Sequence, residues 1–269
     1  MLKDIHSEVA PVVLRNIWNH RSFLLLLALK RAKASFSESR LSRLWWLLEP
    51  ATKVFIYGAI FGLILSPDAR PENFVVSLIC GVAVFDMYTS ATTLASNHLA
   101  SSRNLVGSSS VSSHSLLAST VVEGQVKTAA LPLIAVISAL LFGIQPSWTW
   151  IFLAPLLAWM SIFLYGISLM VAGFTAMYPS FRRIVGAINR VIFYSSGIFW
   201  AVDKVLEPFP ALLVIANLNP VYQFIEIFRF LLYADIGGVL QILPHNVACS
   251  GIVVLIGALI FKLGSRRTS

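Results

Sequence analysis

The chain has 269 residues, of which 57% are hydrophobic and only 12% are charged, and its mean hydropathy is +0.80. Soluble domains carry about 25% charged residues, so this composition excludes an ordinary soluble domain and indicates an all-α integral membrane protein. A net charge of +8 would suggest nucleic acid in a soluble protein. In a membrane protein it is typical of Lys and Arg gathered in cytoplasmic loops, so we expect no nucleic-acid partner.

The N-terminal region predicts a helix on the membrane surface. It has no apolar core followed by a small-residue cleavage site, so we expect no cleavable signal peptide and a cytoplasmic N-terminus. The run FLLLLAL lies between Arg21 and Lys30 and is too short to cross about 30 Å of hydrocarbon. The mixture of apolar and basic residues over 11–33 predicts an amphipathic helix in the interface plane. A cytosolic helix packed on another subunit is the alternative.

Six apolar runs then predict six membrane spans in a single domain over 1–269. At about 20 residues per span, the bundle would occupy about 50–263. The spans are expected at about 50–66, 74–96, 121–143, 149–176, 184–202 and 246–263.

The stretch SRLWWLLEP, which precedes the first span, predicts a bend between the surface helix and that span. Pro50 is compatible with a helix start because its missing N–H would be unpaired there anyway. Glu49 and Lys53 are four residues apart, as are Glu123 and Lys127, and both pairs predict local neutralisation near the headgroups.

The segment between the last two spans has an unusual pattern. Two apolar pieces are broken by Pro208, Pro210 and Asn219-Pro220, and each is too short to span and too apolar for an exposed loop. Broken backbone at membrane depth is tolerated inside protein or beside a water-filled cavity. Residues 203–232 therefore predict short re-entrant helices on the outer side, with two further short spans as the alternative.

Basic residues gather on one side of the expected spans. Eight Lys and Arg precede Trp45, Arg182 and Arg183 follow the fourth span, and further basic residues lie in the C-terminal tail. This bias places both termini in the cytoplasm.

Residues with obvious chemistry are few. There is no phosphate-binding GxxxxGK[ST] loop and no HExxH, CxxC or GxSxG motif, so we expect no metal site and no ATP site in this chain. Cys80 and Cys249 fall in apolar runs and indicate core thiols. Asp86 and Arg190 lie inside expected spans as interhelical partners or pore-lining groups, and the sequence leaves both options open.

Two motifs resemble those of ABC-2 type permeases that export polysaccharides and teichoic acids. The stretch KASFSESRLSRLWWLLEP shares the family's entry motif, although Ser42 stands where relatives have Gly. The stretch NPVYQFIEIFR carries the second motif at the family's spacing. The matching residues are Lys33, Ser39, Leu41, Leu44, Trp45, Leu48, Pro50, Asn219, Pro220, Glu226 and Arg229.

The resemblance implies a homodimer of six-span subunits in the bacterial inner membrane, with two copies of a separate ATPase that binds ATP and Mg. The expected substrate is a glycan on a polyprenyl pyrophosphate: O-antigen, teichoic acid, capsule or cell-wall galactan. Arg40 and Arg43 are candidates for the diphosphate, with ordinary membrane anchoring as the alternative.

The resemblance also implies two further groups of site residues. Aromatics on the two spans that line the channel in relatives would stack on sugars, or would simply pack: Phe55, Tyr57, Phe61, Phe193, Tyr194, Phe199 and Trp200. The ATPase would be contacted through Arg103, Asn104, Tyr178, Phe181, Arg182 and Arg183. Rival functions are an ABC-2 permease for a drug or haem, a membrane enzyme acting on lipid-linked sugars, and a secondary transporter.

Overall fold

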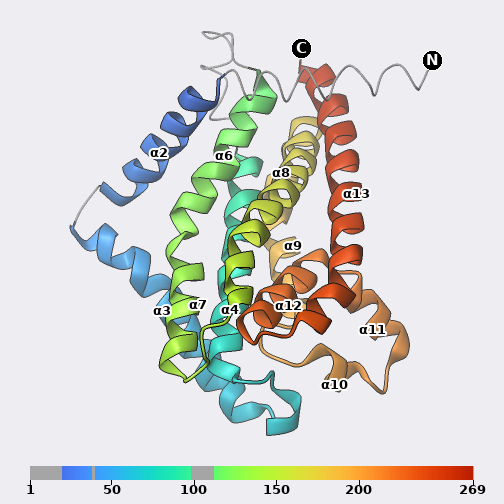
Figure 1. Ribbon diagram of the computed structural model, residues 1–269. Helices are drawn as coiled ribbons and strands as arrows, with labels where there is room; N and C mark the ends of the chain where they lie inside the picture. Colours follow the sequence, from blue (N-terminus) through green and yellow to red (C-terminus); the bar gives the residue numbers. More distant parts are fainter. Residues whose placement is uncertain (1–19, 38–39, 98–111, 269) are drawn as a thin grey trace.

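The computed structural model describes residues 20–37, 40–97 and 112–268, and all regular structure in these ranges is helical (Figure 1). The helices are α2 (Arg21–Ser37), α3 (Arg40–Ile64), α4 (Phe74–Ser96), α6 (Ser113–Thr128), α7 (Ala130–Leu141), α8 (Leu153–Met177), α9 (Phe181–Ser195), α10 (Val202–Leu206), α11 (Pro210–Asn217), α12 (Pro220–Leu232) and α13 (Ile236–Thr268), with short 3₁₀ turns at Pro67–Ala69 and Trp148–Phe152.

Four helical segments of the described chain are long and apolar enough to cross a membrane: Pro67–Ser96, Ser113–Leu141, Trp148–Met177 and Ile236–Ser265. The pair α11 and α12 is bent by 79° and would make a fifth if it is counted as one broken span. The protein is therefore a multi-pass membrane protein. The expected first span lies within the 25-residue helix α3, whose part Ala51–Ile64 is apolar, and the expected fifth span corresponds to α9, which has 15 residues.

The fifth span was expected over 184–202, but α9 ends earlier, at Ser195. Gly197 has a φ of +60°, in the left-handed region that favours glycine, and it turns the chain out of the helix. Ile198 and Phe199, which the sequence pattern places on the same helix, lie fully buried after this turn. At 1.5 Å per residue, the 15 residues of α9 extend about 22 Å, which is less than the hydrocarbon thickness of about 30 Å.

The helix start expected at Pro50 was wrong, because α3 begins at Arg40 and remains helical through Pro50. Proline lacks the N–H that would bond the carbonyl four residues earlier, and membrane helices tolerate this when neighbouring groups satisfy the freed carbonyl. The bend between the surface helix and the first span stays a prediction.

Helix α2 covers the described part of the expected surface helix 11–33, of which residues 11–19 lie outside the described residues. Leu24 and Ala28 are buried one turn apart, and Leu24 packs against Leu116 of α6. The opposite side exposes Leu25 and Leu26. In Figure 1, α2 is inclined against α6. The helix is therefore apolar on two sides, one covered by the same chain and one open.

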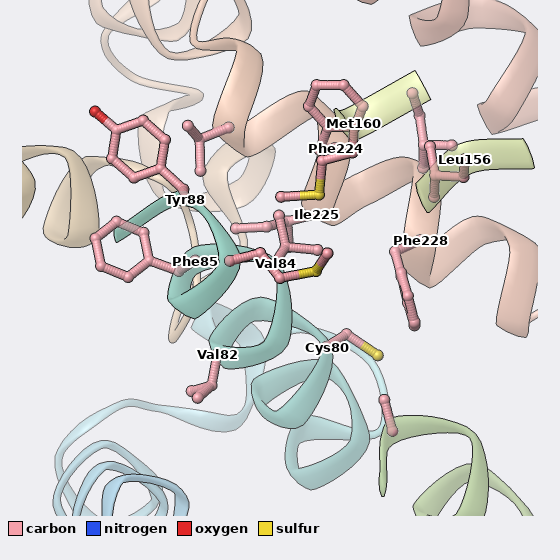
Figure 2. Close-up of a cluster of buried hydrophobic side chains, with 14 of the residues drawn as sticks. Cys80, Val82, Val84, Phe85, Tyr88, Leu156, Met160, Phe224, Ile225 and Phe228 are labelled. Carbon is pink, nitrogen blue, oxygen red and sulfur yellow. The ribbon is translucent and has the colours of Figure 1, made fainter. Parts of the chain in front are cut away.

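The core is built around α4, most of whose residues are buried. Figure 2 shows Met160 of α8 and Phe224 and Phe228 of α12 meeting this helix, while Phe85 lies on another side of it. Burial of a large apolar side chain stabilises a soluble protein by about 1.5–3 kcal/mol, but lipid is itself apolar, so close packing contributes most of the stability here. Cys80, in this core, and Cys249 are free thiols.

Helices α8 and α13 lie in direct backbone contact along a glycine seam made by Gly166, Gly173, Gly257 and Gly264. A Cβ at Gly173 would lie 2.7 Å from the Ile260 carbonyl carbon, and one at Gly264 would lie 2.6 Å from the Gly173 carbonyl oxygen. Each helix places its two glycines seven residues apart, close to two turns, so they share a face. Small residues at such positions let membrane helices approach closely.

The segment α10 to α12 begins and ends near the same end of α4. Ala201 donates its N–H to the Ala69 carbonyl at 2.9 Å, and the Tyr233 hydroxyl donates to the Glu72 carbonyl at 3.2 Å. Figure 1 shows these helices at the end of the bundle opposite to the C-terminal end of α13. The chain therefore leaves α9 and enters α13 from one end of the bundle.

Candidate functional site

Most of the aromatic residues singled out in the sequence gather into one aromatic cluster. Its rings come from α3, α4, α9 and the turn after α9: Tyr57, Phe61, Phe85, Phe193, Tyr194 and Phe199. The turn at Gly197 brings Phe199 back against α3. The short length of α9 thus contributes to building the cluster.

Phe199 is the centre of the aromatic cluster. Its ring stacks on Phe61 at 4.2 Å with an interplanar angle of 11°, and it lies 5.1 Å from Tyr57 and 5.0 Å from Phe193. Phe199 is 1% exposed, whereas Tyr194, at the edge, is 56% exposed. The cluster therefore has a packed interior and an accessible tyrosine rim.

Phe85 of α4 belongs to the cluster but was not expected there. Its ring lies 4.8 Å from that of Phe193. Two expected residues lie outside it. Phe55 is 75% exposed on α3, and Trp200 is half-buried with its indole N–H donating to the Tyr194 carbonyl at 3.2 Å. Trp200 supports the turn that carries the cluster, and Phe55 has no part in it.

A cluster of three charged groups lies next to the aromatic rings. Lys53 precedes Tyr57 by one helical turn, and its Nζ lies 3.0 and 2.9 Å from the two carboxylate oxygens of Asp86 on α4. The same Nζ lies 3.2 Å from Glu49 Oε1. The local Glu49–Lys53 pair was expected. The bond to Asp86 resolves its open role: it is an interhelical partner that joins α3 to α4.

On α9 the three arginines are exposed. The helix is held to α4 by Asn189, whose Nδ2 donates to Thr92 Oγ1 at 3.0 Å. Phe181, at the start of α9, packs against Phe174 at 5.2 Å, and Tyr178 just before it is 57% exposed. Arg182 and Arg183 therefore lie beside an accessible corner between α8 and α9, as a contact with a partner requires.

The second family motif builds a clamp around Arg229. This guanidinium is 3% exposed and donates to the carbonyls of Ser77, Gly197 and Ile198 at 3.0–3.3 Å, while Nη1 pairs with Glu226. It joins α12 to α4 and to the turn that presents Phe199.

Asn219 and Pro220 start α12. The Asn219 side chain accepts from the Val221 N–H at 3.0 Å and donates to Ser196 Oγ at 2.9 Å, and Pro220 occupies the first turn. The motif therefore holds the turn between α9 and α10 from both ends of α12. The spacing between Asn219 and Arg229 in the motif places one residue at each end of this short helix.

Several expected site residues fall outside what the structure describes. Ser39, Arg103 and Asn104 lie outside the described residues. The backbones of five others are helical, but their side chains lie outside the described part: Arg40, Leu41, Arg43, Trp45 and Pro50. Lys33 is exposed on α2.

A second acid–base pair of the helices is local. Glu123 and Lys127 lie on one face of α6 with Nζ and Oε1 2.7 Å apart, as the spacing predicted. Within residues 20–37, 40–97 and 112–268, no group of three or more His, Cys, Asp and Glu is placed to hold a metal ion.

The apolar helices long enough to cross a bilayer define the class as multi-pass membrane proteins. The sequence profile of the ABC-2 type transporter family matches residues 24–233, and the chain belongs to this family. It is therefore a transport permease.

Two curated relatives are both O-antigen export system permease proteins RfbA of Klebsiella pneumoniae. They are 26% and 24% identical to this chain over 188 residues, which cover 69% of this chain and 71% of each relative. These likenesses agree with the polysaccharide-exporter resemblance of the two motifs.

Proposed function

We propose that this protein is the transmembrane subunit of an ATP-driven exporter that moves a polyprenyl-pyrophosphate-linked polysaccharide from the cytoplasmic side across the bacterial inner membrane. The observation that carries the proposal is the aromatic cluster, where α3, α4 and α9 meet. It is supported by the likeness to two O-antigen export permeases. Sugars have apolar faces that stack on aromatic rings, and the exposed Tyr194 offers such a ring together with a hydroxyl group.

The functional unit would be a homodimer with two copies of a separate ATPase, which binds ATP and Mg. A second copy is consistent with the exposed apolar residues of α3, among them Leu63 and Ile64 at 86% and 74%. Both residues lie at the C-terminal end of α3. The ATPase would contact the exposed corner at Tyr178 to Arg183, together with Arg103 and Asn104.

The orientation follows from charge. The starts of α2 and α9 and the C-terminal end of α13 lie toward the same end of the bundle (Figure 1), and basic residues stand in each of these segments: Arg21, Arg182 and Lys262. By the positive-inside rule this end faces the cytoplasm, and α10 to α12 lie on the outer side. There they would form re-entrant helices in a six-span subunit, with α2 at the cytoplasmic interface and membrane lipids around the bundle.

In this arrangement the diphosphate of the carrier would first meet Arg40 and Arg43, at the start of α3. The glycan would then pass the tyrosine rim of the aromatic cluster. Beside the rings, Lys53 pairs with both Asp86 and Glu49, so its positive charge is not free to hold the diphosphate.

The test is depletion of the protein followed by mass spectrometry of lipid-linked glycans. We expect glycan on polyprenyl pyrophosphate to accumulate on depletion. Wild-type protein and the control Phe142→Ala should restore export, because Phe142 is exposed and makes none of the ring contacts of the cluster. The double variant Tyr57→Ala/Tyr194→Ala should reach the membrane at normal level without restoring it. If depletion of the protein leaves the amount of lipid-linked glycans unchanged, the protein does not export them.

A further inference from the structure

Arg190 is the charged residue of the expected spans for which neither the sequence nor the family motifs provide a role. It is exposed on α9, directly after Asn189, which bonds to Thr92 of α4. Thr92 lies four residues before the end of α4 at Ser96, so Arg190 lies about 6 Å inside that end of the helix. A cation within a span is costly and usually marks a functional site.

In the part of the chain that the structure describes, no carboxylate of α9, α8 or α4 pairs with Arg190. Helix α9 has no acidic residue, and α8, which packs on it, has none either. Asp86 is the one acid of α4, and both of its oxygens are held by Lys53. Within residues 20–37, 40–97 and 112–268, Arg190 has no hydrogen-bond or ion-pair partner, so the described part of the chain supplies no anion for it.

The face of α9 that carries Arg190 leads to the aromatic cluster. Arg183, Gly186, Arg190 and Tyr194 follow one another at spacings of three and four residues, so they share one side of the helix. A Cβ added at Gly186 would meet nothing within 4 Å, so this side is open in the subunit. Ile184, Ile188 and Val191 form a separate, apolar side that is also exposed.

We propose that Arg190 binds the diphosphate of the lipid carrier while the adjoining sugars lie on the tyrosine rim of the aromatic cluster. This inference rests on the proposed function and adds a headgroup site to it. The planar guanidinium presents several N–H donors that match phosphate oxygens bidentately. Arg190 lies one turn from Tyr194, on the side that we assign to the cytoplasm. A carrier that enters from the cytoplasm would thus bring its diphosphate to Arg190 with a sugar next to the ring.

The experiment measures binding of undecaprenyl diphosphate to the full-length protein in phosphatidylcholine nanodiscs. Arg190→Gln should weaken binding about 10- to 100-fold, the loss expected for one charge-assisted hydrogen bond or a bidentate pair. Arg190→Lys keeps the positive charge but lacks the planar guanidinium, so this variant should weaken binding of undecaprenyl diphosphate less than Arg190→Gln does. The control Lys204→Gln removes an exposed positive charge on α10 and should bind like wild type.

Three further measurements make the result specific. Wild type should prefer undecaprenyl diphosphate to undecaprenyl monophosphate, and Arg190→Gln should lose most of this preference. An excess of phosphatidylglycerol should not displace the diphosphate, because displacement would mean that Arg190 binds bulk lipid headgroups. The oligomeric state should be the same in Arg190→Gln and wild type, because dissociation would assign Arg190 to the subunit contact. Displacement or dissociation would overturn the inference.

The failures of the two proposals are distinguishable. If wild type binds undecaprenyl diphosphate and Arg190→Gln binds it equally well, the headgroup site is wrong and the export function is untouched. If wild type does not bind it at all, the substrate class itself is wrong.

Discussion

The Arg229 clamp offers a direct test of how the turn after α9 is held. Replacing Arg229 with Leu removes the guanidinium donors that reach the carbonyls of Ser77, Gly197 and Ile198, and it leaves Glu226 without its cation. Since the turn carries Phe199, we expect the variant to lose both stability and the geometry of the aromatic cluster.

The magnitude follows from burial. Arg229 is 3% exposed, and removing one partner of a buried ion pair costs about 3–5 kcal/mol. For a chain of this size, each kcal/mol lowers the melting temperature by about 2–4 °C, so Arg229→Leu should melt about 6–20 °C lower. Arg229→Lys should lie in between, because one ammonium group cannot reach three carbonyls at the positions of the guanidinium nitrogens.

The assay is thermal unfolding of purified protein in detergent, followed by tryptophan fluorescence, because Trp200 lies on the same turn. Arg183→Leu is the matched control, since it removes an exposed arginine from a neighbouring helix. In the double variant Glu226→Leu/Arg229→Leu, part of the loss should return because no buried charge remains unpaired. Melting of Arg229→Leu within about 2 °C of wild type would refute the reasoning that the clamp stabilises the fold.

Two other features can be tested by the same measurement. Gly257→Ala would place a methyl group against the Gly166 carbonyl oxygen and should destabilise the chain by about 1–3 kcal/mol or more, whereas Gly251→Ala, where a Cβ meets nothing within 4 Å, should be neutral or stabilising. Equal effects of the two would contradict the close contact of α8 and α13. A double-mutant cycle with Lys53→Met and Asp86→Asn should give a coupling of about 1–3 kcal/mol, because the two charges are half-buried and doubly bonded; a coupling near zero would show that Lys53 is satisfied by Glu49 alone.

Part of the site could be predicted from the sequence because the family motifs and the apolar runs placed aromatic residues on two particular helices. Tyr57, Phe61, Phe193 and Phe199 do meet. Phe85 could not be predicted, since α4 is apolar on nearly all sides and its pattern does not distinguish the side that faces α9. Hydrophobic periodicity identifies a buried helix but not its neighbours.

Pairing between residues far apart in the sequence could not be predicted either. The spacing of four between Glu49 and Lys53 predicts a local ion pair, which forms, but Asp86 is 33 residues away and becomes a partner only through the packing of α3 on α4.

The helix ends were misjudged for a different reason. The apolar run 184–202 continues through Gly197, and hydropathy does not report that this glycine adopts a left-handed φ. Pro50 shows the opposite error, since a residue that often begins helices is found inside one here.

The glycine seam between α8 and α13 bears on which helices can move relative to one another during a transport cycle. Where the backbones of α8 and α13 touch, no long side chains lie between them that could change rotamer. We therefore expect the two helices to move together as one rigid unit. Helix α3, by contrast, is joined to α4 by flexible rings and a lysine, and much of its other surface has no neighbour in this chain. A displacement of α8 at the basic corner would therefore carry α13 with it, whereas α3 could shift separately.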